Sequence, residues 1–203
     1  MLKGKNSNII VIPNAIRSIE THKDIEKENI VLAVGRHYYV KGLDRLLEAF
    51  ALTKREGWKL VIAGSFGPET ENLISQSKRL GIEENVEFLG AVKEIDKVYA
   101  KAKVFVLPSR SEGFPNALIE SMAHGLACIS FDINAGPAEV IQNKENGILI
   151  TDGDITELGK QIGFLIQNEE ERIRLGNNAV KIKEELTVEK IVDRIYDFIT
   201  LTK

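Results

Sequence analysis

Two short segments of the sequence carry residues that could bind a phosphorylated ligand. The first, residues 35–42, contains Arg36 and Lys41 between flanking glycines. Arginine offers a planar fork of donors that matches phosphate geometry, and lysine adds a compact positive charge. The segment lacks the Gly-x-Gly-x-x-Gly pattern of dinucleotide-binding proteins and the Gly-Lys-Ser/Thr ending of a Walker A loop. This segment alone therefore leaves two alternatives open: a phosphate site of another kind, and two cations that are only solvated loop residues.

The second segment, residues 108–116, contains Glu112 and Gly113 and precedes a predicted helix that carries Glu120. Gly113 permits a close approach between the backbone and a ligand. The start of a helix presents N–H groups and a positive dipole end, which suit a phosphate. A carboxylate within the helix can accept hydrogen bonds from a vicinal diol such as a ribose. This segment alone leaves two alternatives open: Glu112 as a solvated carboxylate, and Glu120 as a residue that only stabilises the helix N-terminus.

The elements predicted around these segments place them at one edge of a sheet. From residue 30 onward, short β-branched runs alternate with segments of helical period. Strands are predicted at 30–34, 59–63, 86–89, 104–107, 127–130 and 148–150, and helices at 42–55, 68–80, 95–102, 116–124, 137–142, 155–166, 170–185 and 188–200. Several strands are apolar at every position, which is typical of strands buried on both faces. The sequence thus predicts an α/β, Rossmann-like, mostly parallel sheet with helices on both faces, whose ligands bind beyond the carboxyl ends of the strands.

Composition limits the classes of function. The 203 residues are 43% hydrophobic and 28% charged, as in a soluble globular domain, and a net charge of −3 with mixed signs disfavours a nucleic-acid-binding protein. No apolar run has the length of a membrane span, and the first residues lack the apolar core of a signal peptide. The single cysteine, Cys128, excludes an intramolecular disulfide and reads as a buried thiol. We therefore expect a cytoplasmic protein.

The sequence offers no obvious metal ligands. One cysteine and three scattered histidines do not form a zinc-site spacing, and His124 reads as a structural residue at a helix end. Asp152-Gly153-Asp154 follows the last predicted strand and reads as a turn with an N-cap rather than as a metal motif. We expect Asn116 to be the N-cap of the helix that carries Glu120.

Glu112 and Glu120 together resemble the E-x7-E signature of retaining GT-B glycosyltransferases of the family 4 type, the glycosyl transferases group 1. Other segments resemble this family in its own order and spacing: Val11 to Ile16, Gly35-Arg36 with Lys41-Gly42, Leu60 to Gly64, Val86 to Gly90, and Gly136 to Ile141. The similarity extends from Ile9 to Phe198. The chain therefore resembles the C-terminal, donor-binding half of such an enzyme, with a linker and residual interdomain segment at 1–29 and a nucleotide-sugar-binding Rossmann-like domain at 30–203.

The resemblance implies roles for matching residues. It implies that Arg36 and Lys41 neutralise the donor diphosphate, that Glu120 holds the ribose hydroxyls, and that Glu112 contacts the donor sugar. The implied catalytic residues are Glu112, Arg36 and Lys41. The implied donor-binding residues are Arg36, Lys41, Gly64, Glu112, Gly113, Phe114, Asn116, Ala117 and Glu120.

The resemblance also implies partners. We expect a nucleotide diphosphate sugar as donor, a UDP-sugar by analogy, with no metal and no further cofactor. The acceptor, a glycan or lipid-linked molecule of bacterial surface polysaccharide synthesis, and a catalytic histidine are expected on an N-terminal domain absent from this chain. Any membrane contact of the full-length enzyme, at the inner face of the membrane, is expected from that half. The isolated chain should bind donor with little transfer, and its last helical segments should leave an apolar patch exposed.

Two features depart from the family pattern. Pro115 stands where many relatives have glycine, so one backbone N–H donor is missing there. In the first loop, His37 to Tyr39 differ from the apolar and polar residues that are usual in the family. Rival interpretations are a non-catalytic nucleotide-sugar-binding module and another GT-B enzyme, such as a sugar epimerase or a phosphorylase. The missing glycine fingerprint disfavours a nicotinamide-dependent enzyme.

Overall fold

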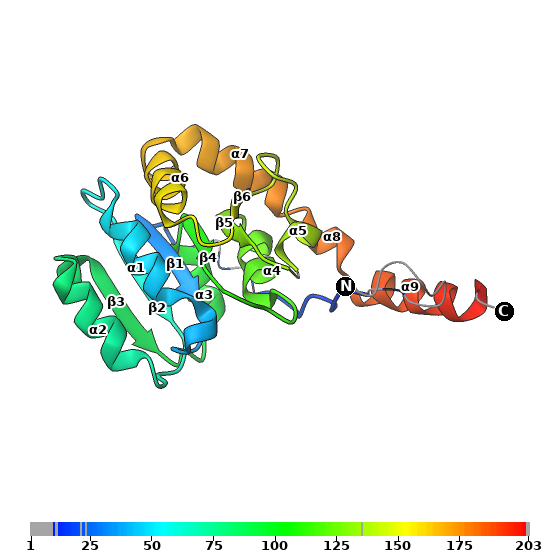
Figure 1. Cartoon of the computed structure of the whole chain (residues 1–203). Coiled ribbons are helices and arrows are strands. Elements are labelled where there is room, and N and C mark those ends of the chain that lie inside the picture. Colours follow the sequence, from blue (N-terminus) through cyan, green and yellow to red (C-terminus); the bar gives the residue numbers. More distant parts are fainter. Residues whose placement is uncertain (1–9, 11, 21, 23, 135, 202–203) are drawn as a thin grey trace.

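The computed structural model of the chain contains a six-stranded sheet with the order β3-β2-β1-β4-β5-β6 (Figure 1). It describes residues 10, 12–20, 22, 24–134 and 136–201. The strands are β1 Ile30–Val34, β2 Lys59–Ala63, β3 Val86–Gly90, β4 Val104–Leu107, β5 Ala127–Asp132 and β6 Ile148–Thr151. All neighbouring strands pair in parallel. The predicted Rossmann-like parallel sheet is confirmed.

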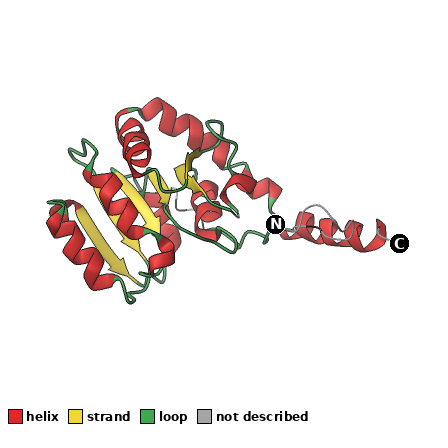
Figure 2. Cartoon of the chain, in the orientation of Figure 1, coloured by secondary structure: helices red, strands yellow, loops and turns green. Residues whose placement is uncertain are grey.

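Helices cover both faces of this sheet (Figure 2). One core contains residues of α1 Leu43–Ala51, α2 Thr70–Arg79 and α6 Ile155–Gln167. The other contains residues of α3 Ile95–Lys101, α4 Asn116–Ala123, α5 Pro137–Val140 and α8 Ile182–Glu185, and α7 Glu169–Ala179 contributes to both. Short 3₁₀ turns are η1 Tyr39–Lys41 and η2 Glu83–Asn85.

The apolar strands are explained by this double coverage. In β1, Val31 and Ala33 belong to the first core, whereas Ile30 and Leu32 belong to the second. Successive side chains of a strand point to opposite faces, so a strand covered on both sides is apolar at every position. Cys128 is fully buried in β5, and burial raises the pKa of its thiol to about 12.

The helix boundaries correct three expectations. Asn116 is not the N-cap of α4: Pro115 takes that place, because its carbonyl accepts the first helical bond from the N–H of Ile119 at 3.1 Å. The predicted helix at 170–185 is two helices, α7 and α8, separated by a turn after Ala179. The predicted helix at 42–55 ends at Ala51, and the hydroxyl of Thr53 donates to the carbonyl of Phe50 at 2.8 Å.

The prediction for Asp152-Gly153-Asp154 is confirmed as a turn with an N-cap. Gly153 has a φ of 81°, in the left-handed region that favours glycine. The carboxylate of Asp154 accepts a hydrogen bond from the N–H of Glu157 at 2.9 Å and so caps α6.

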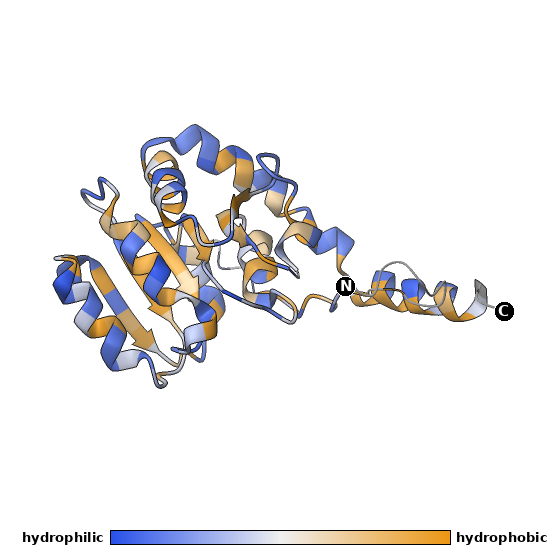
Figure 3. Ribbon diagram, viewed as in Figure 1, coloured by the Kyte–Doolittle hydropathy of each residue, from blue (hydrophilic) through white to orange (hydrophobic). Residues whose placement is uncertain are grey.

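The last helix, α9 Val188–Leu201, extends away from the rest of the molecule (Figure 1). Ile191, near its start, is buried in the second core. Figure 3 shows hydrophobic and hydrophilic residues interleaved along this helix. Its exposed apolar and aromatic residues recur at helical spacing, on both sides of Ile191 in the sequence: Val188, Val192, Ile195, Tyr196 and Ile199. The expected exposed apolar patch is therefore confirmed.

Residues 12–20 run along the second core without forming a helix or a strand. Ile12, Ala15, Ile16 and Ile19 pack against that core, and the N–H of Ile16 donates to the carbonyl of Leu186 at 2.8 Å. We call residues 12–20 the incoming segment. Of the segment Val11 to Ile16 that resembles the family, Val11 lies outside the described residues, as does Ile9, where the resemblance begins. Among the described helices, none is both long and apolar enough to cross a bilayer.

Candidate functional site

The strand order predicts where a ligand binds. Strands β1 and β4 are neighbours in the sheet. The strand that follows β1 in sequence, β2, lies on one side of this pair, and the strand that follows β4, β5, lies on the other side, so the connections run in opposite directions from here. In open α/β sheets, ligands bind outside the carboxyl ends of the strands at such a switch point. The loops that follow β1 and β4 are the two segments that carry the candidate residues, Arg36 and Lys41 on one and Glu112 on the other.

Lys41 and Glu112 form an ion pair across these two loops. The Nζ of Lys41 donates to both carboxylate oxygens of Glu112, at 2.8 and 2.9 Å, and the hydroxyl of Ser109 donates to one of them at 2.6 Å. The side chain of Glu112 is only 9% exposed, against 25% for Lys41. Glu112 is therefore not the solvated loop carboxylate that the sequence left open.

A second ion pair joins the loop after β4 to the first turn of α1. Arg110 donates to both carboxylate oxygens of Asp44, at 2.7 and 2.6 Å, and its guanidinium carbon lies 3.8 Å from the ring centroid of Tyr39. The N–H of Arg110 donates to the carbonyl of Val40 at 2.8 Å. The loops after β1 and β4 thus hold each other in place, which fixes the direction of the Lys41–Glu112 pair.

Gly42 allows this close approach. Its φ is 63°, and a Cβ at this position would lie 2.0 Å from the carbonyl oxygen of Pro108. Gly64 has a similar role at the end of β2, where a Cβ would lie 2.0 Å from the carbonyl oxygen of Gly35. The space that a side chain on Gly64 would need is therefore occupied by the backbone of Gly35. A Cβ on Gly113, in contrast, would have no atom within 4 Å outside its neighbouring residues.

Arg36 is not among the described residues bonded to Glu112, which are Lys41 and Ser109. It is exposed, and its guanidinium carbon is 5.0 Å from the ring centroid of Tyr38. Among the described residues, no carboxylate lies within ion-pair distance of Arg36. Its charge is therefore available to an anion at the end of β1.

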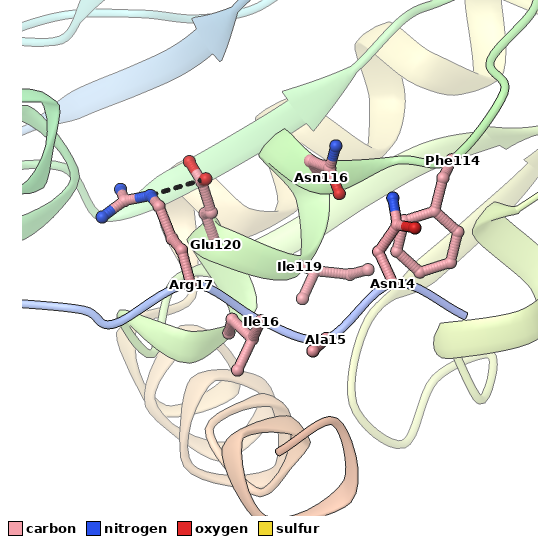
Figure 4. Close-up of a pocket in the computed structure, with 8 residues that line it drawn as sticks. All are labelled: Asn14, Ala15, Ile16, Arg17, Phe114, Asn116, Ile119 and Glu120. Carbon is pink, nitrogen blue, oxygen red and sulfur yellow. Dashed lines mark hydrogen bonds and ion pairs between the residues drawn. The ribbon is translucent and has the colours of Figure 1, made fainter. Parts of the chain in front are cut away.

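Glu120 lies inside α4 and points toward the incoming segment. Its Oε1 accepts a hydrogen bond from the Nε of Arg17 at 2.8 Å, as Figure 4 shows. The hydroxyl of Tyr99 donates to the carbonyl of Ala117 at 3.3 Å, one helical turn before Glu120. Burial, and the charge of Glu120 nearby, raise the pKa of Tyr99 well above its ordinary value, so its hydroxyl stays neutral.

A pocket of about 350 Å³ lies between α4 and the incoming segment (Figure 4). Arg17 and Glu120 line one part of it, and the side chains of Asn14 and Phe114 lie together at another. Asn116 also lines this pocket, so the residue predicted as an N-cap faces it instead. The structure thus brings Phe114, Asn116 and Glu120 to one hollow beside the start of α4.

Three residues near the site were not predicted from the sequence. Ser109 bonds Glu112, and Arg17 bonds both Glu120 and Asp96. Arg17 directly follows the Pro13 to Ile16 segment that carried part of the family resemblance, so that motif could have indicated it. Ser109 and Asp96 had no comparable local pattern.

Residue types that ligate metals are spread over the part of the chain that the structure describes. Within them, no three His, Cys, Asp or Glu side chains are grouped so as to hold a metal ion. His124, read from the sequence as structural, has a side chain only 5% exposed, and its Nε2 donates to Asp96 at 2.9 Å.

Fold and site together define a Rossmann-like α/β domain with cations and carboxylates at its switch point. The family described as glycosyl transferases group 1 matches residues 16–182, and the chain belongs to this family. An uncharacterized glycosyltransferase of Haemophilus influenzae is 34% identical over 194 residues, which are 94% of this chain and 55% of that protein. The amylovoran biosynthesis glycosyltransferase AmsD of Erwinia amylovora is 37% identical over 146 residues, 72% of this chain and 41% of that protein.

Solved structures agree on the fold. TarM of S. aureus, crystallised with UDP, superimposes with a TM-score of 0.87 at 26% identity, over 97% of this chain and 40% of that one. The chain has the fold of one half of a GT-B glycosyltransferase, matching the C-terminal half. It spans about half the length of the curated relatives it matches.

Proposed function

We propose that this chain is the donor-binding half of a retaining glycosyltransferase that uses a nucleotide diphosphate sugar, with UDP as the nucleotide. The observation that carries the proposal is the position of the site: the loops after β1 and β4 bring Arg36, Lys41 and Glu112 to the switch point of the sheet, beside the start of α4. Similarity to TarM, which was crystallised with UDP, supports uracil as the base.

Each group has a role in this proposal. Transfer of the sugar leaves negative charge on the departing diphosphate while the sugar gains oxocarbenium character. Arg36, Lys41 and the N–H groups at the start of α4 interact with the negative charge on the diphosphate. They stabilise the transition state more than the bound donor, because this charge grows as the bond to the sugar breaks. Glu120 accepts hydrogen bonds from the ribose diol. Glu112 contacts the donor sugar, held in place by Lys41 and Ser109. The proposed mechanism requires no metal ion.

The rest of the reaction is assigned to the other half of the enzyme. The chain spans 55% and 41% of the two relatives named above. We propose that the remaining half binds a glycan or lipid-linked acceptor of bacterial surface polysaccharide synthesis and supplies a catalytic histidine. The isolated chain should then bind donor and transfer little sugar. Turnover of a sugar donor by the isolated chain would contradict this part.

The test is calorimetric titration of the chain with UDP and with uridine, in the absence of metal. Arg36→Ala and Lys41→Ala should each weaken UDP binding by roughly tenfold or more, because each removes a charge-assisted hydrogen bond to phosphate, and should leave uridine binding unchanged. Lys59→Ala is the matched control, since Lys59 is exposed at the opposite end of β2. Equal losses for UDP and uridine would overturn the assignment, and titrations with GDP and ADP test the choice of base.

A further inference from the structure

Arg17 connects two carboxylates that belong to different helices. Besides its bond to Glu120 of α4, it donates from Nη2 and Nη1 to the two oxygens of Asp96 in α3, at 2.7 and 2.9 Å. A guanidinium is planar and carries donors along more than one edge, so one arginine can fix both carboxylates in direction. A lysine ammonium at this position would supply the charge without that geometry.

Asp96 is in turn held by groups other than Arg17. The Nε2 of His124 donates to it at 2.9 Å, and so does the N–H of Glu20 at 3.3 Å. The bond from Arg17 holds the pKa of Asp96 well below its ordinary range, so Asp96 is a fixed anion. His124 stacks on the ring of Tyr99, with centroids 5.1 Å apart. Asp96 is therefore a rigid support for the guanidinium.

The burial of these groups shows why Arg17 matters for Glu120. The side chain of Asp96 is 10% exposed and that of Glu120 is 19% exposed, whereas Arg17 is 38% exposed. Without the guanidinium, two partly buried carboxylates would face the same space as like charges. Glu120 would then be expected to turn away from Asp96 and lose its fixed direction.

The incoming segment places Arg17 against α4. Ile16, the preceding residue, packs on the second core, and its N–H is bonded to Leu186. Arg17 therefore reaches Glu120 from a segment about one hundred residues away in sequence, and both line the pocket beside α4.

We propose that Arg17 is a positioning residue that directs the carboxylate of Glu120 toward the ribose diol of the nucleotide. This inference rests on the proposed function, in which Glu120 binds that diol. Arg17 acts through Glu120 and needs no contact with the ligand. Its loss should therefore reduce the preference for a ribose diol and leave other parts of nucleotide binding intact.

The experiment compares UDP with 2′,3′-dideoxyuridine 5′-diphosphate by calorimetry on the 203-residue chain. The wild-type chain should bind UDP more tightly by roughly tenfold or more, since hydrogen bonds to a charged group are lost with the diol. Arg17→Met keeps much of the side-chain stem. It should bring the ratio of the two affinities, UDP over the dideoxy analogue, to within about threefold of unity. Its affinity for the dideoxy analogue should stay within about twofold of the wild-type value. Arg17→Lys should behave like Arg17→Met, because the planar fork is lost.

Two further variants separate positioning from general damage. Arg174→Met removes another arginine that is bonded to both oxygens of a carboxylate, Glu171, and should leave the ratio unchanged. In the double variant Arg17→Met with Glu120→Gln, the ratio should be no lower than in Glu120→Gln alone, because both changes act on the same contact. Thermal unfolding of each variant checks that the domain is folded.

The outcomes are distinguishable. A ratio that falls in Arg17→Met and in Glu120→Gln supports the inference. A ratio that falls only in Glu120→Gln overturns the role of Arg17 and leaves the proposed function standing. Equal weakening of both ligands by Arg17→Met also overturns it, because that is the effect of a merely structural residue. A wild-type chain without preference for the diol overturns the role of Glu120 and the inference with it.

Discussion

His37 lies buried in the same loop as Arg36 and Lys41, between two aromatic rings. Its ring centroid is 5.3 Å from that of Phe66 and 5.6 Å from that of Phe88. Its Nδ1 is hydrogen-bonded to the hydroxyl of Thr70 at 3.1 Å, whereas its Nε2 has no partner among the described residues. Burial lowers the pKa of His37 below its ordinary value. The loop is therefore fixed by a neutral histidine.

This depressed pKa predicts a pH dependence of stability. In the unfolded chain His37 takes up a proton as the pH falls through its ordinary pKa of about 6.5, but the folded chain resists that proton. Stability from this residue is therefore present above pH ~6.5 and is lost as the pH falls toward the lower folded-state pKa. The pKa of His124 is also lowered, mainly by burial and against the effect of Asp96, so it acts in the same direction.

Urea unfolding at pH 5.5 and 7.5 measures this effect. We expect a lower free energy of unfolding at pH 5.5, and a smaller difference between the two pH values in His37→Phe. His22→Phe is the control, because His22 lies in a different part of the chain, before β1. A difference that His37→Phe leaves unchanged would contradict this account of the loop.

Helices α1 and α6 pack closely because α6 has a glycine where they meet. A Cβ on Gly159 would lie 2.9 Å from the carbonyl oxygen of Ala49 and 3.2 Å from the Cβ of Leu52. Gly163, one turn later in the same helix, has more room, since the nearest atom, on Thr53, is 4.0 Å away. The two glycines thus share an element and differ in what surrounds them.

Alanine substitutions should separate helix propensity from packing. Gly163→Ala should raise the free energy of unfolding by up to about 1 kcal/mol, because alanine favours the helix. Gly159→Ala gains the same propensity but must push α1 away, so it should lower the free energy of unfolding by about 1–3 kcal/mol. Urea denaturation of both variants measures this. Equal effects would show that α6 does not approach α1 as closely as described.

The whole molecule ends in a helix that the body of the domain hardly covers. Ile191 is the last described residue of α9 that belongs to a core, and four exposed apolar or aromatic residues follow it on the same helix: Val192, Ile195, Tyr196 and Ile199. Exposed apolar surface of this kind marks an interaction site. In the full-length enzyme we expect the other half to cover this face.

Removal of residues 193–203 should therefore leave the midpoint of thermal unfolding within a few degrees of the intact chain, since none of the described residues that are removed belongs to either core. The same truncation should reduce self-association in sedimentation velocity experiments, because most of the apolar face is removed. Ile191→Ala is the comparison: it should destabilise the domain by about 2–5 kcal/mol, as expected for a truncated core residue. A large loss of stability on truncation would show that the end of α9 contributes to the core.

The sequence by itself determined the parallel sheet, the helices on both faces and the two loops that carry Arg36, Lys41 and Glu112. These predictions rest on hydrophobic periodicity, which is a local property, and on the rule that parallel strands present their carboxyl ends together. The α4 boundary was predicted less well, because the rigid Pro115 took the N-cap position expected for Asn116.

Only the tertiary structure decided how the charged residues are partnered. Lys41 and Glu112 are 71 residues apart, Arg17 and Asp96 are 79 apart, and Arg17 and Glu120 are 103 apart. The incoming segment has no periodic pattern, so the sequence predicted a linker and did not indicate that Arg17 would reach α4. Such ion pairs depend on where folded loops and helices meet, and the free energy that brings them together comes from burying the two cores, not from any pattern near the charges themselves.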